Sequence, residues 1–468
     1  KNGFDLIIAD KPEDFAKNLI EIYHNKEKWE NISKKTIEFI EKNYSYSIGK
    51  SKIKSLLNEL MGKHANSKKF LGVPSDGRIS LLIELSSFDK GGLEKVVLDS
   101  ALAFDKKRFE VTIVTAGKIG HLGEIAKESG LKVIGLNQKD ILSSYDKLLN
   151  DNKFDVAISH FSDLGYRLFA RYEIPNITFI HNVYAFFSNE QSNIFENNDR
   201  FVNRYISVSK NATRYAVGNL GVNEAKIETI ANGLILSEHE ERERRSTTLS
   251  RQDLGLSDSD YVFLNVASYN LHKGHYLMID AMKHLLKMRD DVKILCVGNI
   301  VYEPHYKELV SYIHSEGLQE YIIMPGYIPD VAMMHRISDA FLLPSFIEGW
   351  SIAMNEAMFY KKPMILTNTG ASAEVIENED IGILIENEYG DVVDLNSKIL
   401  DELAYKPQEY RTASILAKAM NRMATNRDDW KKRAEHSREK IYNYYDFNEI
   451  VKRYEKLIEE VFAQSIKG

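Results

Sequence analysis

The chain of 468 residues has little of several features that mark specialised protein classes. Its single cysteine, Cys296, stands in the apolar run "VKILCVG", so a disulfide framework and a cysteine-based zinc site are excluded. No run of about 18 apolar residues occurs, so no membrane-spanning helix is predicted. Positive charge is not in excess, because the formal net charge is −7 and the pI is about 6.1. The overall charge therefore gives no reason to expect a nucleic-acid partner.

What the chain has in quantity is a regular alternation of short apolar runs and amphipathic segments from residue 79 onward. The runs are rich in β-branched residues and bounded by turn residues, which indicates buried strands of a parallel sheet. A charged stretch at residues 237–253, "SEHEERERRSTTLSRQD", separates two such series, and we interpret it as a link. Two series of similar size predict an α/β fold with two Rossmann-like domains facing a cleft, over residues 78–236 and 255–440.

The first 62 residues form an additional, mainly helical segment that resembles the end of the chain. Residues 26–60 align without a gap to residues 427–461, so that Trp29 meets Trp430. The offset is about the size of one complete two-domain unit, and internal repeats of this kind change the whole assignment. We expect residues 1–62 to be the C-terminal tail of a preceding homologous unit in a longer protein. The alternative is a coincidence between two amphipathic helical tails.

This N-terminal segment is also basic, with eleven Lys and five Glu over residues 26–69. A basic helical surface can rest on anionic lipid, whereas more often such charge is simply a solvated face. Peripheral contact with a membrane is one expectation for this segment, and a solvated surface is the other.

The densest functional signal is "SFIEGWSIAMNEAMFYKKPMILTNTGASAEVI", residues 345–376. A strand ends just before the loop "FIEG", so Glu348 lies at the carboxyl end of a parallel strand, where ligands bind in such sheets. The following helix start, with Ser351 and Ile352, offers free backbone N–H groups that suit a diphosphate. Glu356, further along the helix, can accept hydrogen bonds from a ribose, and Glu348 can meet a sugar. A glutamate near a helix start is also favourable without any ligand.

The order of these residues resembles the donor-site signature of retaining glycosyltransferases with the GT-B fold, in family four (glycosyl transferases group 1). That family carries a Glu-x7-Glu motif followed by "G-x-x-E", represented here by Glu348, Glu356, Gly370 and Glu374. The resemblance covers about residues 78–465. It implies that residues 78–236 form the acceptor side and residues 255–440 the nucleotide-sugar side. It also implies that a C-terminal helix over residues 441–465 crosses back to the first domain.

The resemblance implies roles for further residues. "DKGGLEKVV" matches a glycine-rich loop, "FIHNVY" a strand end whose histidine contacts the donor sugar, and "NLHKGHYLMIDAM" a loop whose lysine binds the diphosphate. The expected catalytic residues are therefore His181, Lys273 and Glu348. The expected donor-binding residues are Gly91, Gly92, Ser351, Ile352 and Glu356. Taken singly, His181 could be a hydrogen-bonded histidine at a strand end, Lys273 a solvated lysine, and the two glycines a tight turn.

The sequence departs from the family pattern just before the loop of Lys273. The family usually has an arginine five or six residues before the lysine, where this chain has Ala267 and Ser268. Lys273 would therefore hold the diphosphate with less help.

Neither a metal site nor a cofactor is predicted. The sequence "DSD" at residues 258–260 precedes a strand, at the end of the sheet opposite the ligand, and we interpret it as a turn. No other group of His, Asp and Glu has metal-ligand spacing. The resemblance implies metal-independent chemistry in which Lys273 and a helix end neutralise the leaving diphosphate.

The predicted function is transfer of a hexose, with retention of configuration, from a UDP- or GDP-linked sugar to a hydroxyl of a growing surface glycan or lipid-linked acceptor. Two alternatives stay open: a non-catalytic GT-B scaffold unit, which the missing arginine favours, and a GT-B nucleotide-sugar epimerase, for which no acid–base set is evident. We expect an upstream glycosyltransferase unit in the same polypeptide. The expected location is the cytoplasm, including the inner face of the membrane.

Overall fold

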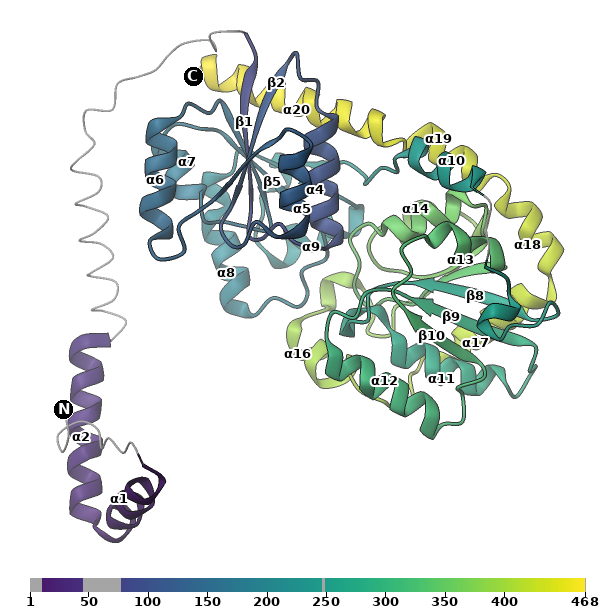
Figure 1. Cartoon of the computed structure of the whole chain (residues 1–468), viewed down its shortest axis with the longest axis horizontal. Coiled ribbons are helices and arrows are strands. Elements are labelled where there is room, and N and C mark those ends of the chain that lie inside the picture. Colours follow the sequence, from purple (N-terminus) through teal and green to yellow (C-terminus); the bar gives the residue numbers. More distant parts are fainter. Residues whose placement is uncertain (1–10, 45–76, 246–248, 468) are drawn as a thin grey trace. The chain divides into compact units, whose positions relative to one another are not determined.

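The computed structural model describes residues 11–44, 77–245 and 249–467, and the chain divides into two compact units, residues 1–73 and 74–468 (Figure 1). We call them the N-terminal unit and the main unit. The described part of the N-terminal unit, residues 11–44, contains two helices, α1 (Pro12–His24) and α2 (Lys26–Tyr44). The remainder of the predicted tail and of the basic stretch lies outside the described residues.

The main unit begins with a seven-stranded parallel sheet in the order β3-β2-β1-β4-β5-β6-β7. Its strands are β1 (Ile79–Leu85), β2 (Phe109–Thr115), β3 (Lys132–Gly135), β4 (Val156–His160), β5 (Asn176–Ile180), β6 (Arg204–Ser207) and β7 (Ile227–Thr229). Its helices are α4 (Gly92–Ala103), α5 (Gly120–Glu128), α6 (Ile141–Asp151), α7 (Tyr166–Arg171), α8 (Asn189–Asn198) and α9 (Lys210–Asn219). We call this the seven-stranded domain.

Helices cover both faces of this sheet because successive side chains of a strand point to opposite faces. Leu81 and Ile83 of β1 belong to the core cluster that includes Val97 of α4. Leu82, between them, belongs to a different cluster with Tyr145 of α6. The strand order reverses between β1 and β4, and ligands of doubly wound sheets bind beyond the carboxyl ends of strands at such a point.

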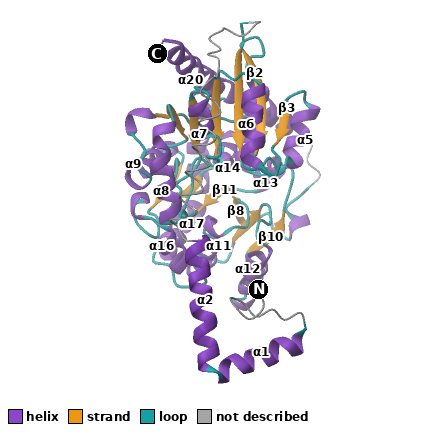
Figure 2. Ribbon diagram, turned by 90° about the vertical axis from the view of Figure 1, so that its left-hand side faces the viewer, coloured by secondary structure: helices purple, strands orange, loops and turns teal. Residues whose placement is uncertain are grey.

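A second parallel sheet follows, with six strands in the order β10-β9-β8-β11-β12-β13. Its strands β8, β10 and β11 are labelled in Figure 2. Its strands are β8 (Tyr261–Val266), β9 (Val292–Val297), β10 (Ile322–Gly326), β11 (Ala340–Leu343), β12 (Met364–Thr367) and β13 (Gly382–Ile385). The helices of this six-stranded domain are α10 (Leu236–Arg244), α11 (His275–Leu285), α12 (Glu303–Ser315), α13 (Val331–Ile337), α14 (Ile352–Phe359), α15 (Ser372–Val375), α16 (Ser397–Ile399) and α17 (Ala413–Thr425).

Three C-terminal helices lead from the six-stranded domain back to the seven-stranded one, namely α18 (Arg427–Ala434), α19 (Ser437–Tyr444) and α20 (Phe447–Lys467). Ile450, Tyr454 and Ile458 of α20 are buried in the core of the seven-stranded domain. Nη1 of Arg108, near β2, lies 2.7 Å from Oε2 of Glu455. The chain therefore crosses between the domains twice, once before α10 and once before α20.

This architecture confirms the predicted fold class, an α/β fold with two parallel sheets and a helical N-terminal segment. The charged stretch after residue 236 holds more structure than a link, because its first residues form α10. Leu236 and His239 are the buried residues of that helix, so its buried side combines one apolar and one polar side chain.

Candidate active site

Two loops meet at the carboxyl end of the six-stranded sheet. The loop after β8 contains a short 3-10 turn (Leu271–Lys273), and the loop after β11 leads to α14. The Phe346 N–H donates to the His272 carbonyl at 2.9 Å. Gly274 has φ +70, and a Cβ at this residue would overlap the carbonyl oxygen of Pro344. Glycine therefore lets the loop of Lys273 lie directly against the loop of Glu348.

Lys273 and Glu348 form an ion pair at this junction, with 2.6 Å between Nζ and Oε1. Their side chains are only 19% and 9% exposed. The same carboxylate oxygen accepts a hydrogen bond from Ser345 Oγ at 2.8 Å, and the Glu348 N–H donates to Thr369 Oγ1 at 3.2 Å. Ser345 and Thr369 were not predicted as site residues, although each stands at the end of an apolar run that the sequence shows as a strand.

Ser351 and Ile352 form the beginning of α14, as their place in the sequence suggests. Ser351 is the N-cap residue and makes no side-chain capping hydrogen bond. The first N–H groups of α14 are thus uncapped by its side chain, and such groups suit an anion. Asn355 fixes the helix, because its amide accepts from Trp350 Nε1 at 2.9 Å and donates to the Asn232 carbonyl at 2.9 Å.

Glu356 lies one turn further along α14 and faces α10. Its Oε1 is 3.8 Å from Nε2 of His239. Burial raises the pKa of Glu356 to about 7, against a smaller lowering by Arg242. Burial, with Arg242, lowers the pKa of His239 to about 4, so this histidine is neutral near pH 7. The contact is therefore not an ion pair at neutral pH, and the ribose contact of Glu356 stays a prediction.

His181 follows β5 and approaches the six-stranded domain through its backbone. Its neighbour Asn182 forms an antiparallel bridge with Gly349, and the Val183 N–H lies 3.4 Å from the Glu348 carbonyl oxygen. A Cβ on Gly349 would overlap the His181 carbonyl, so only glycine allows this approach. The structure thus joins the histidine loop of one domain to the Glu348 loop of the other. His160 was missed, although its Nδ1 lies 2.8 Å from Nε2 of His181.

Gly91 and Gly92 begin α4 at the carboxyl end of β1. Gly91 is the N-cap with extended backbone, φ −178, which any residue adopts. A Cβ on Gly92 would meet no atom within 4 Å, and one on Gly91 would meet only the flexible Glu94 side chain. Packing within the protein does not require either glycine, and their contact with the donor stays a prediction.

A cavity of about 210 Å³ opens at the carboxyl ends of β8, β9 and β10. Ser268, Gly298, Asn299 and Tyr327 are among its lining residues. Ser268 is one of the two positions at which the family usually has an arginine, so this wall carries a hydroxyl in place of a guanidinium. Gly298, Asn299 and Tyr327 were not predicted as site residues. Of these, only Gly298 could have been found from the sequence, because it directly follows a strand.

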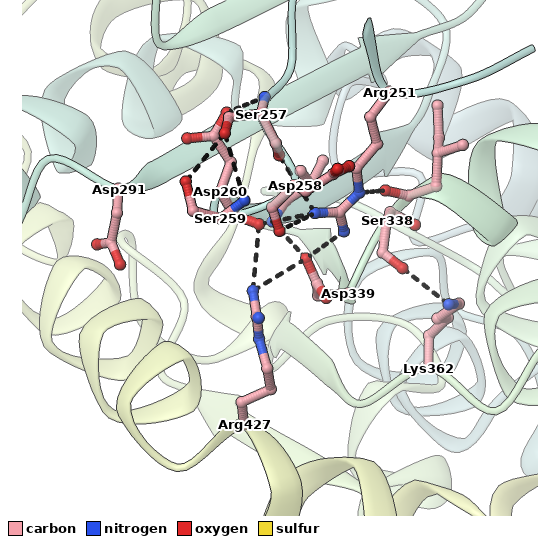
Figure 3. A network of polar contacts seen from close by, with 12 residues as sticks. Arg251, Ser257, Asp258, Ser259, Asp260, Asp291, Ser338, Asp339, Lys362 and Arg427 are labelled. Carbon is pink, nitrogen blue, oxygen red and sulfur yellow. Dashed lines mark hydrogen bonds and ion pairs between the residues drawn. The ribbon is translucent and has the colours of Figure 1, made fainter.

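The "DSD" stretch forms a turn before β8, as interpreted from the sequence (Figure 3). The Ser257 N–H donates to Asp260 Oδ2 at 2.7 Å. Arg251 donates to the Asp260 carbonyl at 2.9 Å and to Asp339 Oδ2 at 2.8 Å. These aspartates stabilise the amino end of the sheet, away from Lys273 and Glu348.

No helix among the described residues is both long and apolar enough to cross a membrane. Within the same part of the chain, no group of three or more His, Cys, Asp or Glu side chains could hold a metal ion.

The architecture defines the fold, the GT-B fold of two parallel-sheet α/β domains. The structure matches that of Anabaena HepE in complex with UDP-glucose with a TM-score of 0.67, at 16% identity, over 82% of this chain and 100% of that one. An identity this low establishes the fold alone.

The sequence defines the family. Residues 246–420 match the model for Glycosyl transferases group 1, and residues 90–238 match the model for Glycosyltransferase Family 4. The chain belongs to the group 1 glycosyltransferases of GT-B fold.

Two relatives are similar to about half of this chain. UDP-Gal:alpha-D-GlcNAc-diphosphoundecaprenol alpha-1,3-galactosyltransferase of Escherichia coli is 25% identical over 269 residues, 53% of this chain and 67% of that protein. N-acetyl-alpha-D-glucosaminyl L-malate synthase of Bacillus anthracis is 23% identical over 225 residues, 48% of this chain and 52% of that protein. The matched region thus spans between half and two thirds of these relatives.

Proposed function

We propose that this protein is a retaining hexosyltransferase that moves a sugar from a nucleotide diphosphate sugar to a hydroxyl group of a glycan or lipid-linked acceptor. The observation that carries the proposal is the ion pair of Lys273 with Glu348, in a loop that meets the His181 loop of the other domain. The name of the E. coli relative and the ligand of Anabaena HepE support UDP as the nucleotide, with GDP as the alternative.

The proposed chemistry depends on stabilising the departing diphosphate. The Lys273 ammonium and the start of α14, at Ser351 and Ile352, would take its growing negative charge, the electrostatic contribution that is often the largest in catalysis. Because these groups neutralise the leaving group, no metal ion is required. Glu348 would orient both Lys273 and the sugar, and we do not assign it as a nucleophile.

The remaining donor contacts surround this centre. Glu356 would accept hydrogen bonds from the ribose, and the cavity beside Ser268 would hold the base. His181 would contact the transferred sugar from the seven-stranded domain. The loop of Gly91 and Gly92 would approach the donor from the same side. Joining the two domains around the donor would exclude water and align the acceptor.

We place the reaction in the cytoplasm, at the inner membrane face when the acceptor is lipid-linked. The diphosphoundecaprenol acceptor in the name of the E. coli relative supports a lipid-linked acceptor. The basic stretch over residues 26–69 is the part of this chain that suits an anionic surface.

A donor screen tests the proposal. The purified chain is incubated in EDTA with a panel of UDP- and GDP-linked hexoses, and release of UDP or GDP is measured with and without lipid-linked and oligosaccharide acceptors. We expect release from one class of donor and a faster rate with acceptor. A chain that binds and turns over none of them would be a scaffold unit. Epimerisation of a donor without nucleotide release would identify an epimerase, and activity that requires added Mn²⁺ would overturn the metal-free mechanism.

A further inference from the structure

The helices of the N-terminal unit repeat, at a constant offset, helices that are buried in the main unit. α1 (Pro12–His24) and α17 (Ala413–Thr425) have the same length and lie 401 residues apart at both ends. Asn25 and Asn426 follow them at the same offset. The Trp29 N–H donates to the Asn25 carbonyl at 3.0 Å, and the Trp430 N–H donates to the Asn426 carbonyl at 3.1 Å. The helix–Asn–helix arrangement therefore repeats together with the sequence.

The two copies differ in what covers their apolar residues. Leu416, Met420 and Trp430 are at most 1% exposed, in the core of the six-stranded domain. α17 lies there against α11. The residues at the same places in the first copy are also apolar, yet they are largely exposed: Phe15 by 61%, Leu19 by 57% and Trp29 by 54%. The first copy therefore has the apolar face of a buried helix, but the described part of the N-terminal unit contains no core that covers it.

We propose that this face, Phe15, Leu19 and Trp29, docks on the C-terminal Rossmann-like domain of a preceding glycosyltransferase unit in the same polypeptide. Within that domain its site is the helix that corresponds to α11. In this chain the corresponding helix, α11, is already covered by α17. Burying three large apolar side chains supplies the stability that isolated helices of this length do not have. The inference rests on the repeat and not on the donor chemistry of the main unit.

Amide hydrogen exchange over residues 12–37 tests this docking. The 468-residue chain is compared with the natural polypeptide that includes the residues encoded before Lys1. We expect exchange in the longer protein to be slower by at least about tenfold, the ratio for 1.4 kcal/mol of local stabilisation. Phe15→Glu with Leu19→Glu should remove this protection. Asp14→Asn with Lys17→Gln, on the opposite side of α1, should keep it.

Four results would overturn the docking proposal. The first is equal exchange in both proteins, and the second is an upstream sequence without a Rossmann-like domain. The third is protection of the 468-residue chain by vesicles containing phosphatidylglycerol, which would assign the face to a membrane. The fourth is protection that appears with dimerisation in light scattering, which would assign the face to a second copy.

A second, independent observation concerns the ends of β4 and β5. His160 Nδ1 and His181 Nε2 are 2.8 Å apart, and the two rings stack with 5.0 Å between centroids. Phe179 stacks on both rings, at 4.3 Å from His160 and 5.3 Å from His181. The backbone N–H of His181 donates to the Tyr184 hydroxyl at 3.0 Å. Both the ring and the backbone of His181 are therefore held in place.

The protonation of this pair follows from its burial. Burial lowers the pKa of His181 to about 3 and holds that of His160 well below its usual value. Two neutral imidazoles share one proton in such a hydrogen bond, so one nitrogen donates and the other accepts. Because Nε2 of His181 is engaged, Nδ1 is its only nitrogen left for a ligand. None of the described residues forms a hydrogen bond with Nδ1, and it is not sealed from solvent.

We infer that His160 is a positioning residue, which holds the ring of His181 through the hydrogen bond to Nε2 so that Nδ1 meets a hydroxyl of the transferred sugar. The inference rests on the proposed function, because it requires a sugar at His181.

Two substitutions separate this role from packing. His160→Phe keeps a ring for Phe179 and His181 to stack on but removes the hydrogen bond, whereas His160→Asn keeps a polar atom near the place of Nδ1. We expect His160→Phe to lower kcat/KM for the preferred UDP-hexose by about three- to tenfold, the range for one hydrogen bond. Affinity for UDP alone should not change, and His160→Asn should recover most of the loss.

An imidazole ¹⁵N NMR spectrum gives a readout besides activity. We expect the Nε2 resonance of His181 to shift in His160→Phe, because this nitrogen loses its hydrogen-bond partner. The inference is overturned if His160→Phe leaves both kcat/KM and the Nε2 resonance unchanged, or if UDP affinity falls in parallel, which would show a structural role alone. A wild-type chain that turns over no nucleotide sugar would instead overturn the proposed function.

Discussion

Nζ of Lys273 lies 2.6 Å from Oε1 of Glu348, although the two residues are 75 positions apart in the sequence. The pair links the loop after β8 to the loop after β11, at the end of the sheet where ligands of this fold bind. A diphosphate that approaches Lys273 therefore meets an ammonium that already has a partner. Glu348 orients the lysine, and it also repels a second negative charge.

Replacing Glu348 by Gln should separate these two effects. Gln keeps a polar group for Ser345 but removes the charge, so UDP should bind at least as tightly as to the wild type. Turnover should fall by at least about tenfold, because Lys273 and the sugar lose their common orienting group. Calorimetry with UDP and steady-state kinetics measure the two quantities. An unchanged kcat would remove Glu348 from the active site.

Ser268→Arg should restore the cation that the family usually has beside the diphosphate. A charged hydrogen bond to phosphate contributes roughly 1.5–3 kcal/mol, so we expect UDP to bind about ten- to hundredfold more tightly. Ser268→Gln is the control for side-chain size, and it should show little gain. Equal affinities for the two variants would mean that position 268 does not face the diphosphate.

Gly349→Ala should impair the approach of the two domains. A Cβ at this position would overlap the carbonyl of His181, so the His181 loop must move away. Displacement of a reacting group by about 1 Å can lower the rate about a hundredfold, whereas UDP affinity should change little. Gly218→Ala is the control, because a Cβ at Gly218 meets only Val393, at 3.9 Å. A normal kcat/KM in Gly349→Ala would show that this contact is dispensable.

Donor affinity should depend on the ionisation of Glu356. Burial raises the pKa of Glu356 to about 7, so the carboxyl is largely protonated at pH 6 and charged at pH 8. The charged form accepts hydrogen bonds from two ribose hydroxyls better, so UDP affinity should rise from pH 6 to pH 8. In Glu356→Gln this rise should disappear. A rise that persists in the variant would assign the titration to another group.

The raised pKa of Glu356 also makes the stability of the fold decrease as pH rises. Because the folded-state pKa of Glu356 exceeds its ordinary value, its stabilising contribution is complete at low pH and is lost as pH rises through about 7. Glu356→Gln should therefore raise the free energy of unfolding at pH 8 by up to about 3 kcal/mol. Glu84→Gln is a matched control. Burial also raises the pKa of Glu84 to about 7, but Glu84 lies in β1, so its replacement should change stability without changing UDP affinity.

The sequence predicts the sheets well because their buried strands are short, β-branched and separated by turn residues. It also indicates Glu348, since a strand, a glycine and a helix start are local features. It does not show that the Lys273 ammonium reaches Glu348, or that Glu356 faces His239 of α10. These contacts depend on side-chain direction across elements far apart in the chain. His160 was missed for the same reason, because the sequence around a histidine at a strand end does not indicate which residue it contacts.

The most direct test of the account compares nucleotide release by the wild type and by Lys273→Ala, at saturating donor and in EDTA. Charge grows on the diphosphate as the sugar leaves, so the lysine should matter more for turnover than for ground-state binding. We predict a kcat at least about a hundredfold lower in Lys273→Ala, with a much smaller change in KM. Equal kcat values in the two proteins would contradict it, because Lys273 would then be a lysine without a role in the departure of the diphosphate.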